Sequence, residues 1–242
     1  MKKISQIFLL LLVAAGLPFS SVANPGNDGA ISGNGKVTTQ NRTIGSFHAL
    51  KVSGGIDVDL SQGNDIKLQV EADENLIENI QTVVKDGVLN IYPEESVRKA
   101  KVMKIHLTFR DIDAINASGG CDITSTQKLD FTTLQTDLSG GCDIKLELKV
   151  NNLVSKHNGG CDATFNGEAE NCTLKVSGGC DVKASDFHIK NCSVDASGGS
   201  DVWVYATGIL DLKASGASDV TYAGSPSKVT KSASGASDIH CK

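Results

Sequence analysis

The stretch that decides the fold is Ser177-Gly178-Gly179-Cys180-Asp181-Val182, one of seven similar segments in the second half of the chain. The other six begin at Ser118, Ser139, Asn158, Ser197, Ser215 and Ser234. The steps between them are 21, 19, 19, 20, 18 and 19 residues, and an eighth copy begins at Ser53. A regular period of this length is typical of proteins built from stacked structural repeats.

Each repeat predicts two short strands, one on either side of the glycine-containing turn. Cys172, Leu174 and Val176 alternate with polar residues before the turn, and Cys180 and Val182 do so after it. Period-two alternation places one face of a strand inward and the other outward. Strands this short bury an apolar face only when neighbouring repeats stack. The sequence therefore predicts an all-β fold, a β-helix-like solenoid with about 19 residues per coil.

The start of the chain predicts export. Lys2 and Lys3 precede an apolar run, and Ser21-Val22-Ala23 supplies small residues where a signal peptidase cuts. Residues 1–23 are therefore a predicted signal peptide, cleaved after Ala23, which directs the protein to the periplasm, the cell surface or the medium. No later apolar run is long enough for a membrane-spanning helix.

The remaining residues divide by their regularity. Residues 24–34 are rich in Asn, Gly and Ser and are expected to form a flexible leader. Residues 35–242 are expected to form a single solenoid. Its coils are irregular and carry longer excursions over residues 35–113, and they are regular over residues 114–242.

The charge of the chain excludes some partners. Without Lys2 and Lys3 the chain has 21 basic and 28 acidic residues, a formal charge of −7. Nucleic acids and anionic membranes require a basic surface, so neither is an expected partner. A homo-oligomer remains compatible with the sequence.

The cysteines fall into columns when the repeats are aligned. Cys121, Cys142, Cys161 and Cys180 share one column with Ile56, Ser200, Ser218 and Ser237, and the other three cysteines align with mainly apolar residues. We expect these thiols to pack as small buried side chains. Two alternatives stay open. Export permits disulfides, and His157 lies near Cys142, Cys161 and Cys180, a combination that zinc accepts. C-x-x-C spacing is absent, so we expect no metal and no cofactor.

A second column is acidic and faces outward: Asp57, Asp122, Asp143, Asp162, Asp181, Asp201, Asp219 and Asp238. Unit charges about 5 Å apart repel one another even in water, so the column requires a compensating interaction. We expect the carboxylates to bond backbone N–H groups at the turns and to act as a structural ladder. The alternative is calcium, because a Gly-Gly pair followed closely by Asp is similar to part of the calcium-binding repeat Gly-Gly-x-Gly-x-Asp.

One pair of residues interrupts the polar outward surface. Trp203 and Tyr205 lie two residues apart and therefore on the same face of a predicted strand. Neighbouring exposed aromatic rings stack on sugars or anchor a protein partner, so this pair is the candidate ligand surface. The five histidines show no metalloprotease spacing, and no nucleophile elbow or phosphate loop occurs. We therefore assign no catalytic residue.

Three motifs together resemble the head GIN domain family, which is common in Bacteroidetes and described as auto-transporter adhesins. They are Phe47-x-x-Leu-x-Val-Ser-Gly-Gly-Ile-Asp-Val58, the hairpin Val84-x-Asp-Gly-x-Leu-x-Ile91, and repeats of the type Ser215-Gly-Ala-Ser-Asp-Val220. The resemblance covers roughly residues 43–239. It implies a right-handed β-solenoid at the cell surface or in the periplasm.

The expected function is an exported structural or adhesive surface module without catalytic activity, binding a glycan or a surface protein. Two alternatives remain: a carbohydrate-active enzyme that processes polysaccharides, and a periplasmic envelope scaffold. Fold alone does not choose among them.

Overall fold

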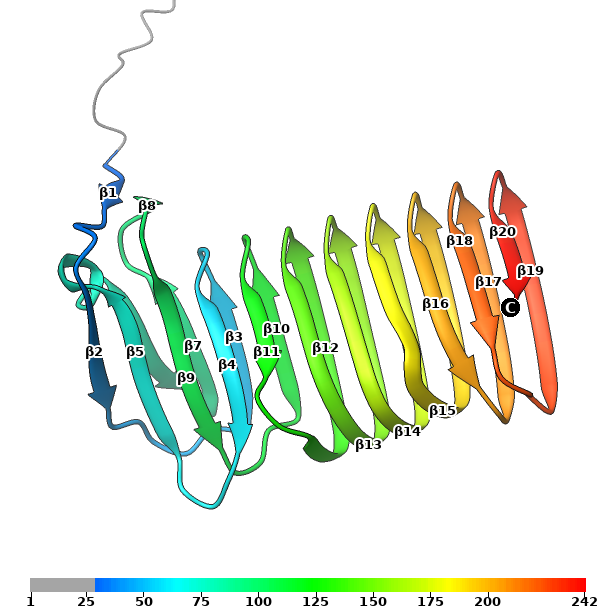
Figure 1. Cartoon of the computed structure of the whole chain (residues 1–242), viewed down its shortest axis with the longest axis horizontal. Helices are drawn as coiled ribbons and strands as arrows, with labels where there is room; N and C mark the ends of the chain where they lie inside the picture. The colour runs from blue at the N-terminus through cyan, green and yellow to red at the C-terminus, as the bar shows by residue number, and fades with distance from the viewer. Residues whose placement is uncertain (1–28) are drawn as a thin grey trace, which may run out of the picture.

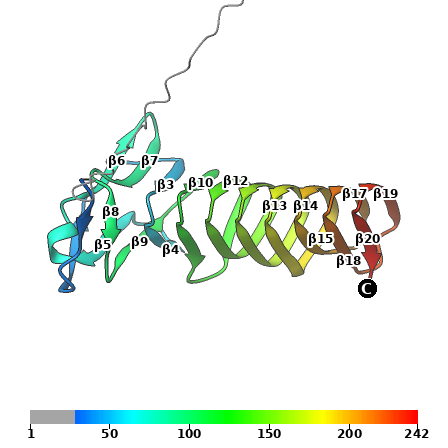
Figure 2. The ribbon, with the colours of Figure 1, turned by 90° about the horizontal axis from the view of Figure 1, so that it is seen from above.

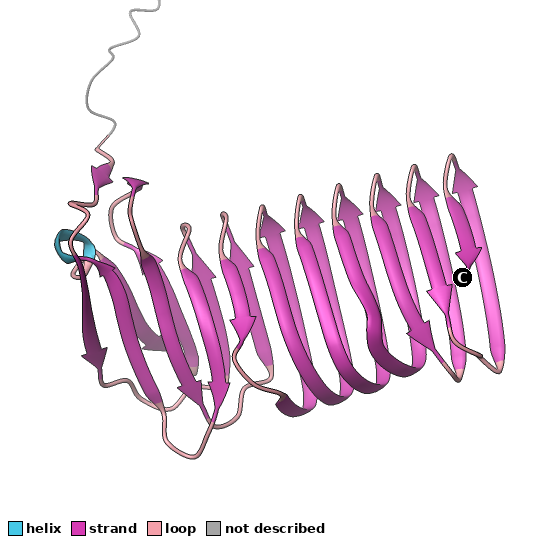
Figure 3. Cartoon of the chain, viewed as in Figure 1, coloured by secondary structure: helices cyan, strands magenta, loops and turns pink. Residues whose placement is uncertain are grey.

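The computed structural model describes residues 29–242, which consist almost wholly of β-strands (Figure 3). The predicted signal peptide and the first leader residues, 24–28, lie outside the described residues. Within residues 29–242 no helix is long and apolar enough to cross a membrane.

The regular half of the chain is a β-solenoid, which confirms the predicted fold class (Figure 1). Each coil pairs in parallel register with the next, as the sequence columns require; His157, for example, pairs with Leu138 on one side and Val176 on the other. Its strands are β10 (Ala114–Ser118), β11 (Asp122–Ser125), β12 (Leu129–Gly140), β13 (Asp143–Gly159), β14 (Asp162–Gly178), β15 (Asp181–Gly198), β16 (Asp201–Ala206), β17 (Ile209–Gly216), β18 (Asp219–Ala223), β19 (Lys228–Gly235) and β20 (Asp238–Cys241).

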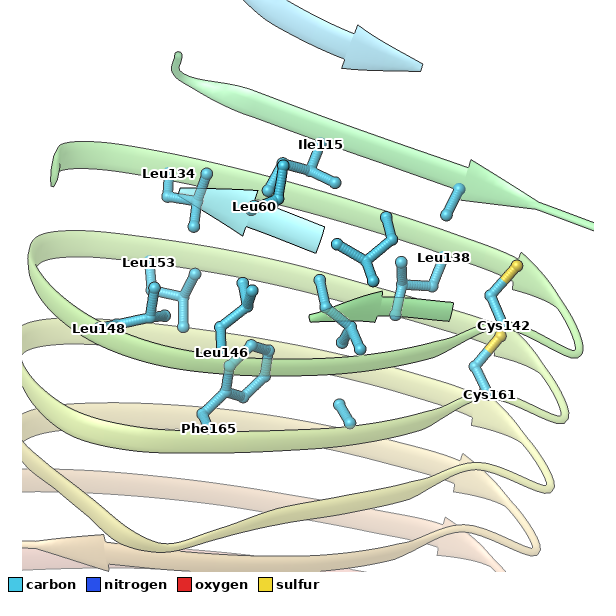
Figure 4. Close-up of a cluster of buried hydrophobic side chains, with 14 of the residues drawn as sticks. Leu60, Ile115, Leu134, Leu138, Cys142, Leu146, Leu148, Leu153, Cys161 and Phe165 are labelled. Carbon is cyan, nitrogen blue, oxygen red and sulfur yellow. The ribbon is translucent and has the colours of Figure 1, made fainter. Parts of the chain in front are cut away.

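The core is the space enclosed by the coils, filled by one inward side chain in every two (Figure 4). Leu138, Cys142, Leu146, Leu153 and Phe165 are all at most 1% exposed. Because the same inward position recurs in every coil, the apolar columns form one continuous hydrophobic core along the solenoid.

The turns between the two strands of a coil require glycine at their first position. Gly178 has φ +99°, a conformation that L side chains rarely adopt, and a Cβ there would lie 2.3 Å from the carbonyl oxygen of Gly159 in the preceding coil. The second position is free of both restrictions at Gly179. The turns can therefore stack closely only because their first residue has no side chain.

The N-terminal part contains β1 (Ile31–Ser32), β2 (Val37–Arg42), β3 (Ala49–Ser53), β4 (Asp57–Gln62), β5 (Lys67–Asp73), the short 3-10 helix η1 (Glu74–Leu76), β6 (Ile80–Lys85), β7 (Val88–Pro93), β8 (Val97–Lys99) and β9 (Met103–Phe109). The Asp86-Gly87 turn joins β6 and β7 as an antiparallel hairpin, which projects from the body in Figure 2. Part of the expected leader is packed: β1 pairs with β8, and the Gly33 N–H bonds the carbonyl of Lys99 at 2.7 Å.

The first coil, formed by β3 and β4, lies between strands that come later in the sequence. On one side β3 pairs with β7 and β4 with β9; on the other side they pair with β10 and β11. The chain must therefore return across this coil between Phe109 and Ala114. The irregular region thus differs from a simple succession of coils.

Candidate functional site

The Cys/Ser column is a ladder of hydrogen bonds as well as part of the core. The thiol of Cys142 donates to the carbonyl of Ser139 at 3.2 Å, and its sulfur accepts the backbone N–H of Cys121 at 3.4 Å. Ser200 makes the same two kinds of bond, donating to the carbonyl of Ser197 at 3.0 Å and accepting from the N–H of Cys180 at 3.5 Å. Cys and Ser can therefore replace one another in this column, because both side chains donate and accept hydrogen bonds.

Ile56 is the apolar exception and begins the column. The layer before Ile56 is formed by β7 and β9, which are joined by residues 94–102 rather than by a tight glycine turn. The column therefore tolerates an aliphatic side chain only at its first position.

All seven cysteines are free, and six are buried; Cys241 is exposed in the last coil. Burial raises the pKa of the Cys121 thiol to about 11, and burial also raises the pKa of Cys161. The Cys172 thiol has its pKa raised by a hydrogen bond with Cys192, its in-register neighbour, and by burial. These thiols are therefore protonated at neutral pH and available as hydrogen-bond donors.

Cys142→Ser is expected to keep the stability of the protein within about 1 kcal/mol, because serine preserves both bonds of the ladder. Cys142→Val removes both and leaves the buried N–H of Cys121 without its acceptor, which costs about 1–3 kcal/mol. Urea unfolding of the two variants under reducing conditions measures the difference. Equal stability would show that only packing matters in this column.

His157 is fully buried within the coil and belongs to a short polar chain. Its Nε2 lies 2.7 Å from the hydroxyl of Ser155, and Ser155 in turn hydrogen-bonds Thr136. Its Nδ1 has no hydrogen-bond partner among residues 29–242. Burial lowers the pKa of His157 to about 4, so the ring is neutral at physiological pH.

The residues suggested for a metal are not gathered into a cluster in the described part of the chain. Residues 29–242 contain no group of three or more His, Cys, Asp or Glu side chains that could hold a metal ion. Cys142, Cys161 and Cys180 instead direct their thiols to backbone carbonyls. His157 forms its hydrogen bond with the hydroxyl of Ser155.

The aspartates form the expected column, in register from Asp122 to Asp238. At its N-terminal end Asp57 pairs with Lys104 on β9. The pKa of Asp201 is raised by partial burial and then by Asp181 and Asp219, while a backbone hydrogen bond opposes the rise. Of the column, Asp238 accepts the N–H of the adjacent Ile239 at 2.8 Å, a bond within β20 rather than to the glycine turn.

Trp203 and Tyr205 both lie on β16 and face outward, half-buried, between the inward Val202, Val204 and Ala206. The ring of Tyr205 meets the ring of His188 edge to face, with centroids 4.9 Å apart. Trp203 and Tyr205 thus lie on the same outward face of one strand. We call Trp203 and Tyr205 the aromatic platform.

Sequence reasoning missed three polar features. Asn152, Asn171 and Asn191 form a side-chain ladder with bonds of 3.0 and 3.1 Å. Their spacing of 19 and 20 residues, which follows the period of the repeats, was the available signal. His106 bridges Glu71 at 2.9 Å and Asp59 at 3.3 Å, and these three residues come from strands whose pairing the sequence did not indicate.

The third feature is a hollow of about 620 Å³ where the chain returns across the first coil. Ile112 and Phe131 line its base, and Asp111, Asp113 and Asp130 line it together with His48. His48 Nδ1 lies 3.3 Å from the Asp113 carboxylate, and both side chains are exposed. Its walls come from loops far apart in sequence, so no local motif indicated it.

The stacked coils, the continuous core and the outward polar columns define a β-solenoid repeat protein. The sequence model of the family described as "Putative auto-transporter adhesin, head GIN domain" matches residues 46–226. The chain belongs to this family. No curated protein matches it.

Several solved structures share the fold. A "putative adhesin" from Bacteroides fragilis superposes with a TM-score of 0.82 at 22% identity, over 88% of this chain and 100% of that one. A "putative lipid binding protein" from Parabacteroides distasonis gives 0.74 at 22% identity, over 88% and 99%. A "putative adhesin" from Parabacteroides merdae gives 0.67 at 20% identity, over 88% and 99%. At these identities the likeness shows the fold alone.

Proposed function

We propose that this chain is an exported, non-catalytic adhesive module that binds a glycan through the aromatic platform. The observation that carries the proposal is the placement of Trp203 and Tyr205, two half-exposed rings on a strand face that is otherwise polar. Aromatic rings with an apolar face and a polar edge suit sugars, which have the same division. The surrounding strands hold the rings in place without a loop, so little ordering is lost on binding.

Export and family membership support the adhesive part of this proposal. A signal peptide cleaved near Ala23 would deliver the mature chain to the periplasm, the cell surface or the medium. The family is described by its adhesin character. A column that repeats one aspartate per coil supports a structural role for the acidic residues rather than a catalytic pair.

Trp203→Ala is expected to weaken glycan binding at least about tenfold, because aromatic anchors carry much of the energy of such contacts. The measurement is binding of the mature protein to an array of neutral and acidic glycans, followed by calorimetry on those bound. Tyr92→Ala is the matched control, since Tyr92 is an exposed aromatic of the N-terminal part. Equal losses of glycan binding in both variants would overturn the proposal, and so would a parent protein that binds no glycan.

The absence of catalysis is tested on the same glycans. Incubation with each bound polysaccharide should release no product. Release that depends on a carboxylate such as Asp201 would make the chain a carbohydrate-active enzyme instead. Fractionation of cells then locates the protein, because a strictly periplasmic chain would be a scaffold rather than an adhesin.

A further inference from the structure

The two sides of the aromatic platform differ in what covers the rings. On the side of the preceding coil, Trp203 pairs with Lys183 and Tyr205 with His188, two long side chains. On the side of the following coil, Trp203 pairs with Thr221 and Tyr205 with Ala223. Both partners on β18 are small, so the rings are flanked by bulk on one side only.

The strand β18 therefore offers a strip beside the rings, which we define as its outward residues Asp219, Thr221 and Ala223. At the Ala223 end the paired residues of β18 and β20 end at Tyr222 and Cys241, and the N–H of Lys242 bonds the carbonyl of Tyr222 at 2.9 Å. Beyond Thr221 lies His240, whose side chain pairs with Asp238 at 3.4 Å. A ligand lying on this strip would meet the ring surfaces that face away from His188.

The negative charge at the Asp219 end of the strip favours some ligands over others. Asp201 and Asp219 are in-register neighbours. Asp201 precedes Trp203 by two positions, and Asp219 precedes Thr221 by two positions. The pKa of Asp201 is raised by partial burial and then by the neighbouring carboxylates of Asp181 and Asp219. Sugar hydroxyls can donate hydrogen bonds to these oxygens, whereas the carboxylate of a uronic acid would add to the repulsion.

We infer that the platform takes a neutral oligosaccharide, which lies along the β18 strip with its ring faces against Trp203 and Tyr205 and its hydroxyls toward Asp201 and Asp219. At roughly 3.3 Å per residue, the two aromatic residues are roughly 7 Å apart along the strand. At least two linked sugars are then needed to meet both rings. This inference rests on the proposed function and adds the class and direction of the ligand.

Thr221→Tyr tests the position of the ligand, because it fills the strip while keeping the platform and suits an outward strand position. Neutral oligosaccharide binding should fall at least about tenfold. Thr164→Tyr is the matched control, since Thr164 occupies the same outward column two coils before Trp203. It should bind as the parent does. Equal binding by Thr221→Tyr would overturn the assignment of the strip.

Asp219→Asn tests the charge selection. Relative to the parent, this variant should gain binding to uronic-acid oligosaccharides of matched length and should not gain binding to neutral ones. A parent protein that binds uronic acids as well as neutral sugars would overturn the ligand class. If Trp203→Ala still abolishes that binding, the proposed glycan function stands while this inference fails; if Trp203→Ala has no effect, both fail.

Discussion

Gly178→Ala is expected to destabilise the solenoid by about 3 kcal/mol or more. A left-handed backbone conformation costs a residue with a side chain about 1–2 kcal/mol. The new Cβ would also lie 2.3 Å from the Gly159 oxygen, and overpacking of this kind costs about 1–3 kcal/mol. The two turns would have to separate, so the backbone hydrogen bond from Gly179 to Gly159, now 2.7 Å, would lengthen as well.

The adjacent Gly179→Ala supplies the control, because a Cβ at this position meets nothing within 4 Å. The sequence already carries alanine at the equivalent positions Ala217 and Ala236. Chemical unfolding should therefore separate the two variants clearly. Similar midpoints would mean that the turns of neighbouring coils are not closely packed against one another.

Acidification is expected to destabilise the protein through His157. In the unfolded chain histidine has a pKa near 6.5, whereas burial lowers the pKa of His157 in the folded state to about 4. Between these values the unfolded state binds the proton and the folded state does not. The contribution of His157 to the free energy of unfolding is therefore fully present above about pH 6.5. It is lost as the pH decreases toward 4, by about 3 kcal/mol in total.

His157→Leu should remove this part of the pH dependence, and leucine already occupies the adjoining position at Leu138. The free energy of unfolding of both proteins is measured from pH 7.5 to pH 4. Because all carboxylates are shared, the difference between the two curves isolates His157. Parallel curves would show that the imidazole is not buried as a neutral ring.

Much of the fold was predictable because the same repeat determines the strands, their inward faces and the register between coils. Alternation gave the inward and outward faces, and the period gave the register that pairs Asp143 with Asp162 and Leu153 with Cys172. The hydrogen bonding of Cys142 was less accessible, since free cysteine is commonly a simple core residue. The presence of Ser200 in the same column was the available indication that this position makes hydrogen bonds.

The N-terminal region was less predictable because its strands pair across long stretches of sequence. Nothing local indicates that β4 pairs with β9, or that His106 therefore meets Asp59. The hollow around Asp113 has the same origin. For the aromatic platform, the period-two pattern gave the shared face of Trp203 and Tyr205. The small size of Thr221 and Ala223 acquired a meaning only once the register of β16 and β18 was known.

The return of the chain across the first coil has a consequence for folding. Residues 49–62 have one set of neighbours in β7 and β9 and the other in β10 and β11, so both flanks of this coil are completed only by later parts of the chain. Such pairings have high contact order and form slowly. In a chain synthesised from its N-terminus, this end must wait for residue 125 to become available. The local repeats from β12 onward, which need only their nearest neighbours, can then nucleate first and serve as a template for the end that was made before them.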